Sequence, residues 1–100
     1  MTDQEQQELN RLLYDWWHKK TGDHYTPIGQ SHLLTDLNWL FELLRMLAAE
    51  GKVVSIKIYP KQGEWEVMLF WSLFKAVTAT ADTIELALAI CLGKIIKETK

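Results

Sequence analysis

The chain has 100 residues, of which 48% are hydrophobic and 24% are charged, a composition that is typical of a folded domain and excludes a disordered chain. This length is enough for one hydrophobic core and too short for two, so we expect a single domain over residues 1–100. The formal net charge of −2 offers no basic field to phosphates, which disfavours nucleic acid as a partner.

Cysteine content and hydropathy give expectations about location. The lone cysteine, Cys91, has no second cysteine to pair with, which indicates a reducing compartment, so we expect a cytoplasmic protein. The first residues lack the basic start and the apolar stretch of a signal peptide, and no apolar run approaches the ~20 residues that span a membrane. We therefore expect neither export by that route nor a membrane partner.

The first segment, residues 2–21, has the pattern of an amphipathic helix. Thr2 and Glu5 have the spacing of a capping box, in which each residue hydrogen-bonds the backbone of the other. Five large apolar residues then recur at helical spacing: Leu9, Leu12, Leu13, Trp16 and Trp17. Residues 22–30 are rich in turn-forming residues and are predicted to be a connector.

A second helix is predicted over residues 31–50, ending before Gly51. Its main apolar stripe contains seven residues: Leu33, Leu34, Leu37, Leu40, Phe41, Leu44 and Leu47. At about 100° per residue, Trp39, Leu43 and Met46 form a second apolar strip beside it. Two interpretations of this strip remain open, because the first helix can cover it within the monomer or the strip can be a partner-binding face.

Three strands are predicted after Gly51, over residues 52–59, 64–72 and 73–80, where the apolar pattern changes to a period of two. The first strand is expected to end at Pro60, and a turn before Glu64 makes the first two strands an antiparallel hairpin. The second strand is apolar on both faces, since Met68 and Phe70 lie opposite its other apolar residues.

A last helix is predicted over residues 83–98, opened by a capping box of Asp82 and Glu85. Three helices and a central strand that is apolar on both faces favour helices on both sides of the sheet. The predicted fold is therefore α+β, a three-layer α/β/α sandwich with a short antiparallel sheet of about three strands.

This order of elements, together with three local motifs, resembles the phage ABA-sandwich domain, a family of small proteins from bacteriophage and prophage genomes. The motifs are Tyr25–Thr26–Pro27 ahead of the Leu-rich helix that carries Trp39, then residues 63–67 (Gly-Glu-Trp-Glu-Val), then residues 81–89 opening the last helix. The resemblance covers most of the chain and implies a small phage-derived binding protein that inhibits a bacterial defence complex, such as a CRISPR effector, by docking onto it.

Two other functions remain open: a structural or accessory phage protein that acts as a homo-oligomer, and an unrecognised small-ligand binder. The expected partner is accordingly a host protein or a second copy of the chain in a homodimer.

Motifs for catalysis and for metal binding are missing from the sequence. His18, His24 and His32 lack the spacing of a zinc site, and Cys91 lies on an apolar helical stripe that is typical of an inert core thiol. The glycines are scattered singly, so the chain has no phosphate-binding loop. We therefore expect a protein that is not an enzyme and that binds neither a metal nor a cofactor.

Overall fold

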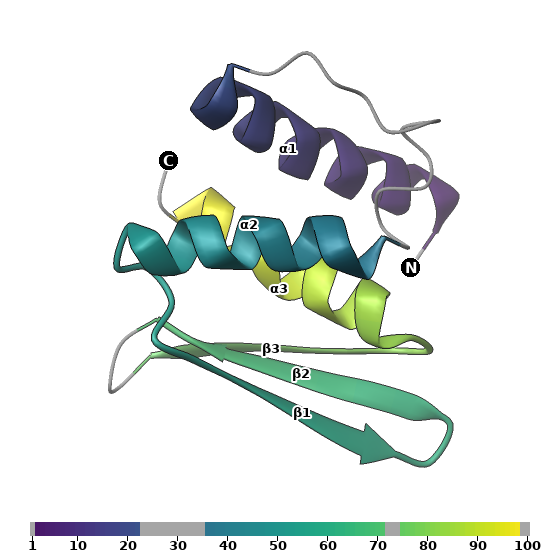
Figure 1. Ribbon diagram of the computed structural model, residues 1–100. Coiled ribbons are helices and arrows are strands. Elements are labelled where there is room, and N and C mark those ends of the chain that lie inside the picture. Colours follow the sequence, from purple (N-terminus) through teal and green to yellow (C-terminus); the bar gives the residue numbers. More distant parts are fainter. Residues whose placement is uncertain (1, 23–35, 72–74, 99–100) are drawn as a thin grey trace.

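The computed structural model describes residues 2–22, 36–71 and 75–98 of the chain (Figure 1). Within these residues the elements follow in the order α1 (Asp3–Thr21), α2 (Leu37–Ala49), β1 (Ser55–Lys61), β2 (Glu64–Phe70), β3 (Ala76–Ala81) and α3 (Ile84–Glu98). The strands form one antiparallel sheet in the order β1-β2-β3. The predicted α+β class, with helices packed on a short antiparallel sheet, is confirmed.

The three helices lie on one face of the sheet (Figure 1). Helix α3 packs directly on β2 and β3, and α1 and α2 both pack against α3. The layer order therefore differs from the predicted one, in which helices cover both faces. The reason lies in the outer face of β2, where the Lys57 ammonium sits 5.5 Å from the ring centre of Phe70. Long lysine side chains can cover apolar surface in this way, so the outer face does not require a helix.

Helix α1 begins and ends as its sequence predicts. The Glu5 N–H donates to Thr2 Oγ1 (3.2 Å) and the Thr2 N–H donates to Glu5 Oε1 (3.2 Å), which completes the capping box. Hydrogen bonding to the Thr2 backbone, and then to its side chain, lowers the pKa of the Glu5 carboxyl. The helix stops at Gly22, whose φ of 67° is the left-handed conformation that glycine adopts without strain.

Helix α2 begins at Leu37 rather than at Ser31, and residues 31–35 of that prediction lie outside the described part of the chain. Asp36 has an extended backbone, and its Oδ1 accepts a hydrogen bond from the Trp39 N–H at 3.2 Å. An aspartate in this position satisfies a backbone donor that has no partner within the helix, which fixes the start of the helix at the next residue.

The strand and helix boundaries after Gly51 also shift by a few residues. Strand β1 continues through Pro60, which pairs with Trp65, because an edge strand tolerates a residue without an N–H. A two-residue turn follows, in which Gly63 has a φ of 72°. The predicted ends at residues 72 and 73 lie outside the described residues.

Helix α3 starts at Ile84, directly after Thr83, so Asp82 is not its capping residue as the predicted box of Asp82 and Glu85 requires. The Leu86 N–H donates to Thr83 Oγ1 at 3.1 Å, so Thr83 is the capping residue. Aspartate and threonine both cap helices well, and the choice between two adjacent candidates depends on where the chain leaves β3.

Candidate functional site

The strip of Trp39, Leu43 and Met46 lies mostly inside the monomer. Trp39 is 6% exposed and Leu43 is fully buried, while Met46 is half-buried. The Trp39 ring packs edge-on against the ring of Trp17 in α1, with a centroid distance of 6.3 Å and an interplanar angle of 67°. The structure therefore favours the interpretation that α1 covers the strip, which we call the α1–α2 seam, and leaves little of it for a partner.

Apolar packing forms the centre of the seam, and at the C-terminal end of α2 the Lys20 ammonium of α1 donates a hydrogen bond to Glu50 Oε1 at 3.1 Å. The indole nitrogens of Trp17 and Trp39 and the Oδ1 atom of Asn10 are buried and have no hydrogen-bond partner in the described structure. Each such unpaired group costs ~1–3 kcal/mol of stability. The large aromatic areas and the edge-on ring contact must offset that cost.

An uncovered apolar surface lies instead along β1. Its Ile58 and Ile56 are paired with Val67 and Leu69 of β2, so all four side chains point to the helical side of the sheet. Val67 and Leu69 are fully buried, whereas Ile58 is 37% exposed and Ile56 is half-buried. The cause is geometric, because an α-helix ~10 Å wide covers only about two strands that are ~4.8 Å apart. Helix α3 covers β2 and β3 and leaves β1 open.

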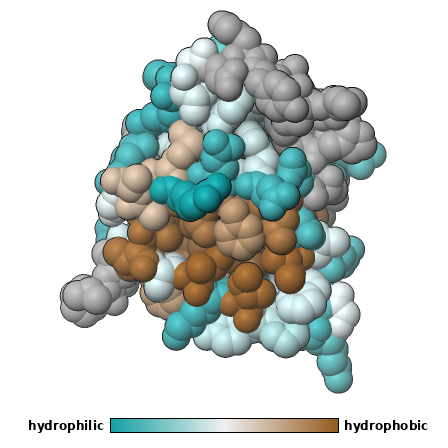
Figure 2. All heavy atoms as spheres, viewed as in Figure 1, coloured by the Kyte–Doolittle hydropathy of each residue, from teal (hydrophilic) through white to brown (hydrophobic). Residues whose placement is uncertain are grey.

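Helix α2 extends this surface with the side that it turns away from α1. Leu37, Phe41 and Leu44 lie at i, i+4 and i+7 on one side of the helix, with Leu37 and Phe41 half-buried and Leu44 nearly buried. Figure 2 shows apolar side chains gathered across the middle of this face, over α2 and down toward the sheet. We call the half-buried residues Leu37 and Phe41, with Ile56 and Ile58, the apolar face, and Leu44 is buried in the core beneath it.

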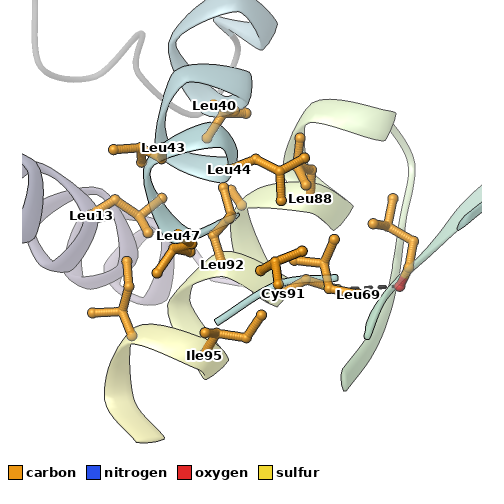
Figure 3. Packing of buried hydrophobic residues seen from close by; sticks show 14 of the residues in the cluster. Leu13, Leu40, Leu43, Leu44, Leu47, Leu69, Leu88, Cys91, Leu92 and Ile95 are labelled. Carbon is orange, nitrogen blue, oxygen red and sulfur yellow. Dashed lines mark hydrogen bonds between the residues drawn. The ribbon is translucent and has the colours of Figure 1, made fainter. Parts of the chain in front are cut away.

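Cys91, the only cysteine, lies in the core at the centre of α3 and is fully buried (Figure 3). Its thiol donates to the Val67 carbonyl oxygen of β2 at 3.2 Å. Burial raises the pKa of the Cys91 thiol from 9.0 to about 12, against a smaller opposing effect of Lys94. At neutral pH the thiol is protonated, and it has neither the exposure nor the charge of a nucleophile.

The residues that the structure describes contain no group of three or more His, Cys, Asp or Glu side chains that could hold a metal ion. His18 stacks on Tyr14, with ring centres 6.0 Å apart. His24 and His32 lie outside the described residues. In the same part of the chain, no helix has both the length and the apolar character that crossing a bilayer requires.

We expect a chelator to leave the stability of the protein unchanged. A structural metal would contribute several kcal/mol to folding, so its removal would lower the melting temperature by many degrees. Thermal unfolding in the presence and absence of excess EDTA measures this directly. A large decrease on chelation would overturn the expectation of a metal-free protein.

Sequence reasoning identified the apolar residues of the candidate site but not their exposure. The alternation of Ile56 and Ile58 shows that one side of β1 is apolar. It does not show that the helices above the sheet cover fewer strands than the sheet contains, which is what leaves these side chains exposed.

Comparisons with models of known protein families, with curated proteins and with solved structures find no match for this chain.

Proposed function

We propose that this chain is a non-enzymatic binding protein that docks onto another protein through the apolar face. The observation that carries the proposal is the incomplete cover of β1, where Ile58 keeps 37% of its surface exposed beside a fully buried Val67. Contiguous apolar surface that the monomer does not bury marks interaction sites. Phe41 supplies an aromatic side chain of the kind that anchors protein interfaces.

Docking through side chains is favoured over the addition of a strand. Pro60 in β1 has no N–H to offer to a partner strand, which blunts that edge of the sheet. At the other edge, Lys94 Nζ donates to the Thr78 carbonyl oxygen of β3 at 2.7 Å. Both edges of the described sheet therefore carry features that oppose pairing, while the apolar face stays open.

The specific form that we propose is a phage-derived inhibitor that acts in the host cytoplasm on a bacterial defence complex, such as a CRISPR effector. Support for this form comes from the resemblance of the sequence motifs to the phage ABA-sandwich domain. The buried, protonated Cys91 thiol is compatible with an inhibitor that works by occupying a surface rather than by chemistry.

The test is a set of binding and DNA-cleavage assays with purified CRISPR effector complexes and three variants. Phe41→Ala and Ile58→Asp are each expected to weaken binding by ~2 kcal/mol or more, about 30-fold in affinity, because each removes apolar contact area. Asn38→Asp adds one negative charge to an exposed position of the same helix and is the matched control. It is expected to bind as the unmodified chain does.

The outcomes separate the two parts of the proposal. If the unmodified chain neither binds nor inhibits these complexes, the assignment to a defence complex is wrong. If it binds and both variants bind equally well with unchanged melting temperatures, the apolar face is not the docking surface.

A further inference from the structure

A second surface, a groove between α1 and α3, shares no residue with the apolar face. Its volume is about 340 Å³, and it is lined by Glu5, Glu8, Leu9 and Leu12 of α1 and by Ile90, Gly93, Lys94 and Lys97 of α3. The half-buried side chains Leu9, Leu12 and Ile90 give it an apolar floor. The acidic residues stand on the α1 wall and the lysines on the α3 wall.

Gly93 explains how the two helices can come so close. It is buried, and a Cβ atom at this position would lie 2.6 Å from Leu9 Cδ1. Glycine therefore lets the Leu9 side chain rest against the backbone of α3. The Leu9 side chain therefore covers Gly93 and forms the floor between the charged walls.

Only some of the charged side chains on the two walls form hydrogen bonds within one copy of the chain. One carboxylate oxygen of Glu5 takes part in the capping box with Thr2, and the Lys94 ammonium donates to Thr78 of β3. Glu8 and Lys97 make no hydrogen bond or ion pair within the described residues. An acidic wall and a basic wall thus face the same groove, each with a charge that is free to pair.

We propose that a second copy of this chain packs its own groove against this one, so that the two copies form a two-fold symmetric dimer. A two-fold axis that runs along the groove places the acidic wall of each copy against the basic wall of the other. It also encloses the apolar floors of Leu9, Leu12 and Ile90 between the two copies. Such an interface uses the same patch on both copies, so every favourable charge pair occurs twice.

The pattern of charge is what selects a second copy over other occupants. An acidic segment or a nucleic acid would meet Lys94 and Lys97 favourably, but Glu5 and Glu8 would repel it across the same groove. A basic segment would be attracted by Glu5 and Glu8 but repelled by Lys94 and Lys97. A surface that carries both signs on opposite walls is complementary to itself after a two-fold rotation.

Sedimentation equilibrium of the full chain tests the dimer. The unmodified chain is expected to show a mass that approaches twice 11.7 kDa as its concentration rises. Glu8→Lys and Lys97→Glu each place like charges opposite one another at two symmetric positions, and each is expected to raise the dimer Kd at least ~10-fold. The combined variant Glu8→Lys/Lys97→Glu exchanges the signs of the walls and is expected to restore the Kd to within roughly threefold.

The controls match the charge changes outside the groove. Arg45→Glu and Glu42→Lys alter exposed residues of α2 by the same number of charges, and both are expected to leave the dimer Kd unchanged. Circular dichroism verifies that each variant is folded, as expected because Glu8 and Lys97 are exposed. A salt concentration of about 1 M is expected to weaken the dimer, since it shortens the screening length to ~3 Å.

Three results would overturn the proposal. The first is a chain that remains monomeric up to about 1 mM, where even weak dimers form. The second is a dimer whose Kd is the same in both single reversals. The third is a combined variant that stays monomeric although it is folded. None of these results bears on docking through the apolar face, because that surface contains none of the groove residues.

Discussion

Replacing Trp39 by aspartate is expected to lower the free energy of unfolding by roughly 3–5 kcal/mol. Trp39 is 6% exposed and packs edge-on against Trp17, so the substitution removes a buried aromatic ring and puts a carboxylate in its place. This loss is a large part of the ~5–15 kcal/mol that stabilises a typical domain. Urea and thermal unfolding measure it, and the variant is expected to melt far below the unmodified protein.

Trp39→Phe is the matched control for this seam. It keeps an aromatic ring against Trp17 and removes an indole N–H that has no partner in the described residues. The lost packing area is then partly offset by the removal of an unpaired buried donor, so a loss below ~2 kcal/mol is expected. If Trp39→Asp melts like the unmodified protein, Trp39 does not belong to the core and the α1–α2 seam is wrong.

Cys91 is expected to resist alkylation in the folded protein. With a pKa raised from 9.0 to about 12, the fraction of thiolate near pH 8 falls by about a thousandfold, and the side chain is also fully buried. Reaction with iodoacetamide, followed by mass spectrometry, is expected to be at least that much slower in buffer than in urea. Rapid labelling of the folded chain would show that the thiol is neither buried nor protonated.

The same shift predicts how stability depends on alkaline pH. Below pH 9 the thiol is protonated in both the folded and the unfolded chain and contributes no pH dependence. Between pH 9 and about 12 the unfolded chain loses this proton while the folded chain keeps it, so stability falls as the pH rises. The slope from this one group is at most ~1.4 kcal/mol per pH unit.

Cys91→Ala isolates the contribution of this thiol from that of the other groups in the chain. The variant is expected to be less stable near neutral pH because it leaves a small cavity. Its stability is expected to fall less steeply than that of the unmodified protein above pH 9. Equal slopes for the two proteins would mean that the Cys91 pKa is the same in the folded and unfolded chains.

The elements of this fold follow from local features of the sequence. The capping box of Thr2 and Glu5 sets the first turn of α1, and Gly22 ends that helix through a conformation that other residues adopt at a cost. The change to a period of two after Gly51, with Gly63 in the turn, predicts the hairpin of β1 and β2. These features act within a few residues, so they can be recognised without the rest of the chain.

Only the tertiary structure decided which apolar surfaces are covered and by what. The periodicity of α2 predicts two apolar sides equally well, but Trp39 is buried against Trp17 whereas Phe41, on the other side, remains half-exposed. Likewise, Phe70 suggested a helix on the outer face of the sheet, and the side chain of Lys57 lies there instead. A sequence pattern shows which side chains are apolar. Whether such a side chain is buried depends on the widths and positions of helices and strands that are far away in the chain.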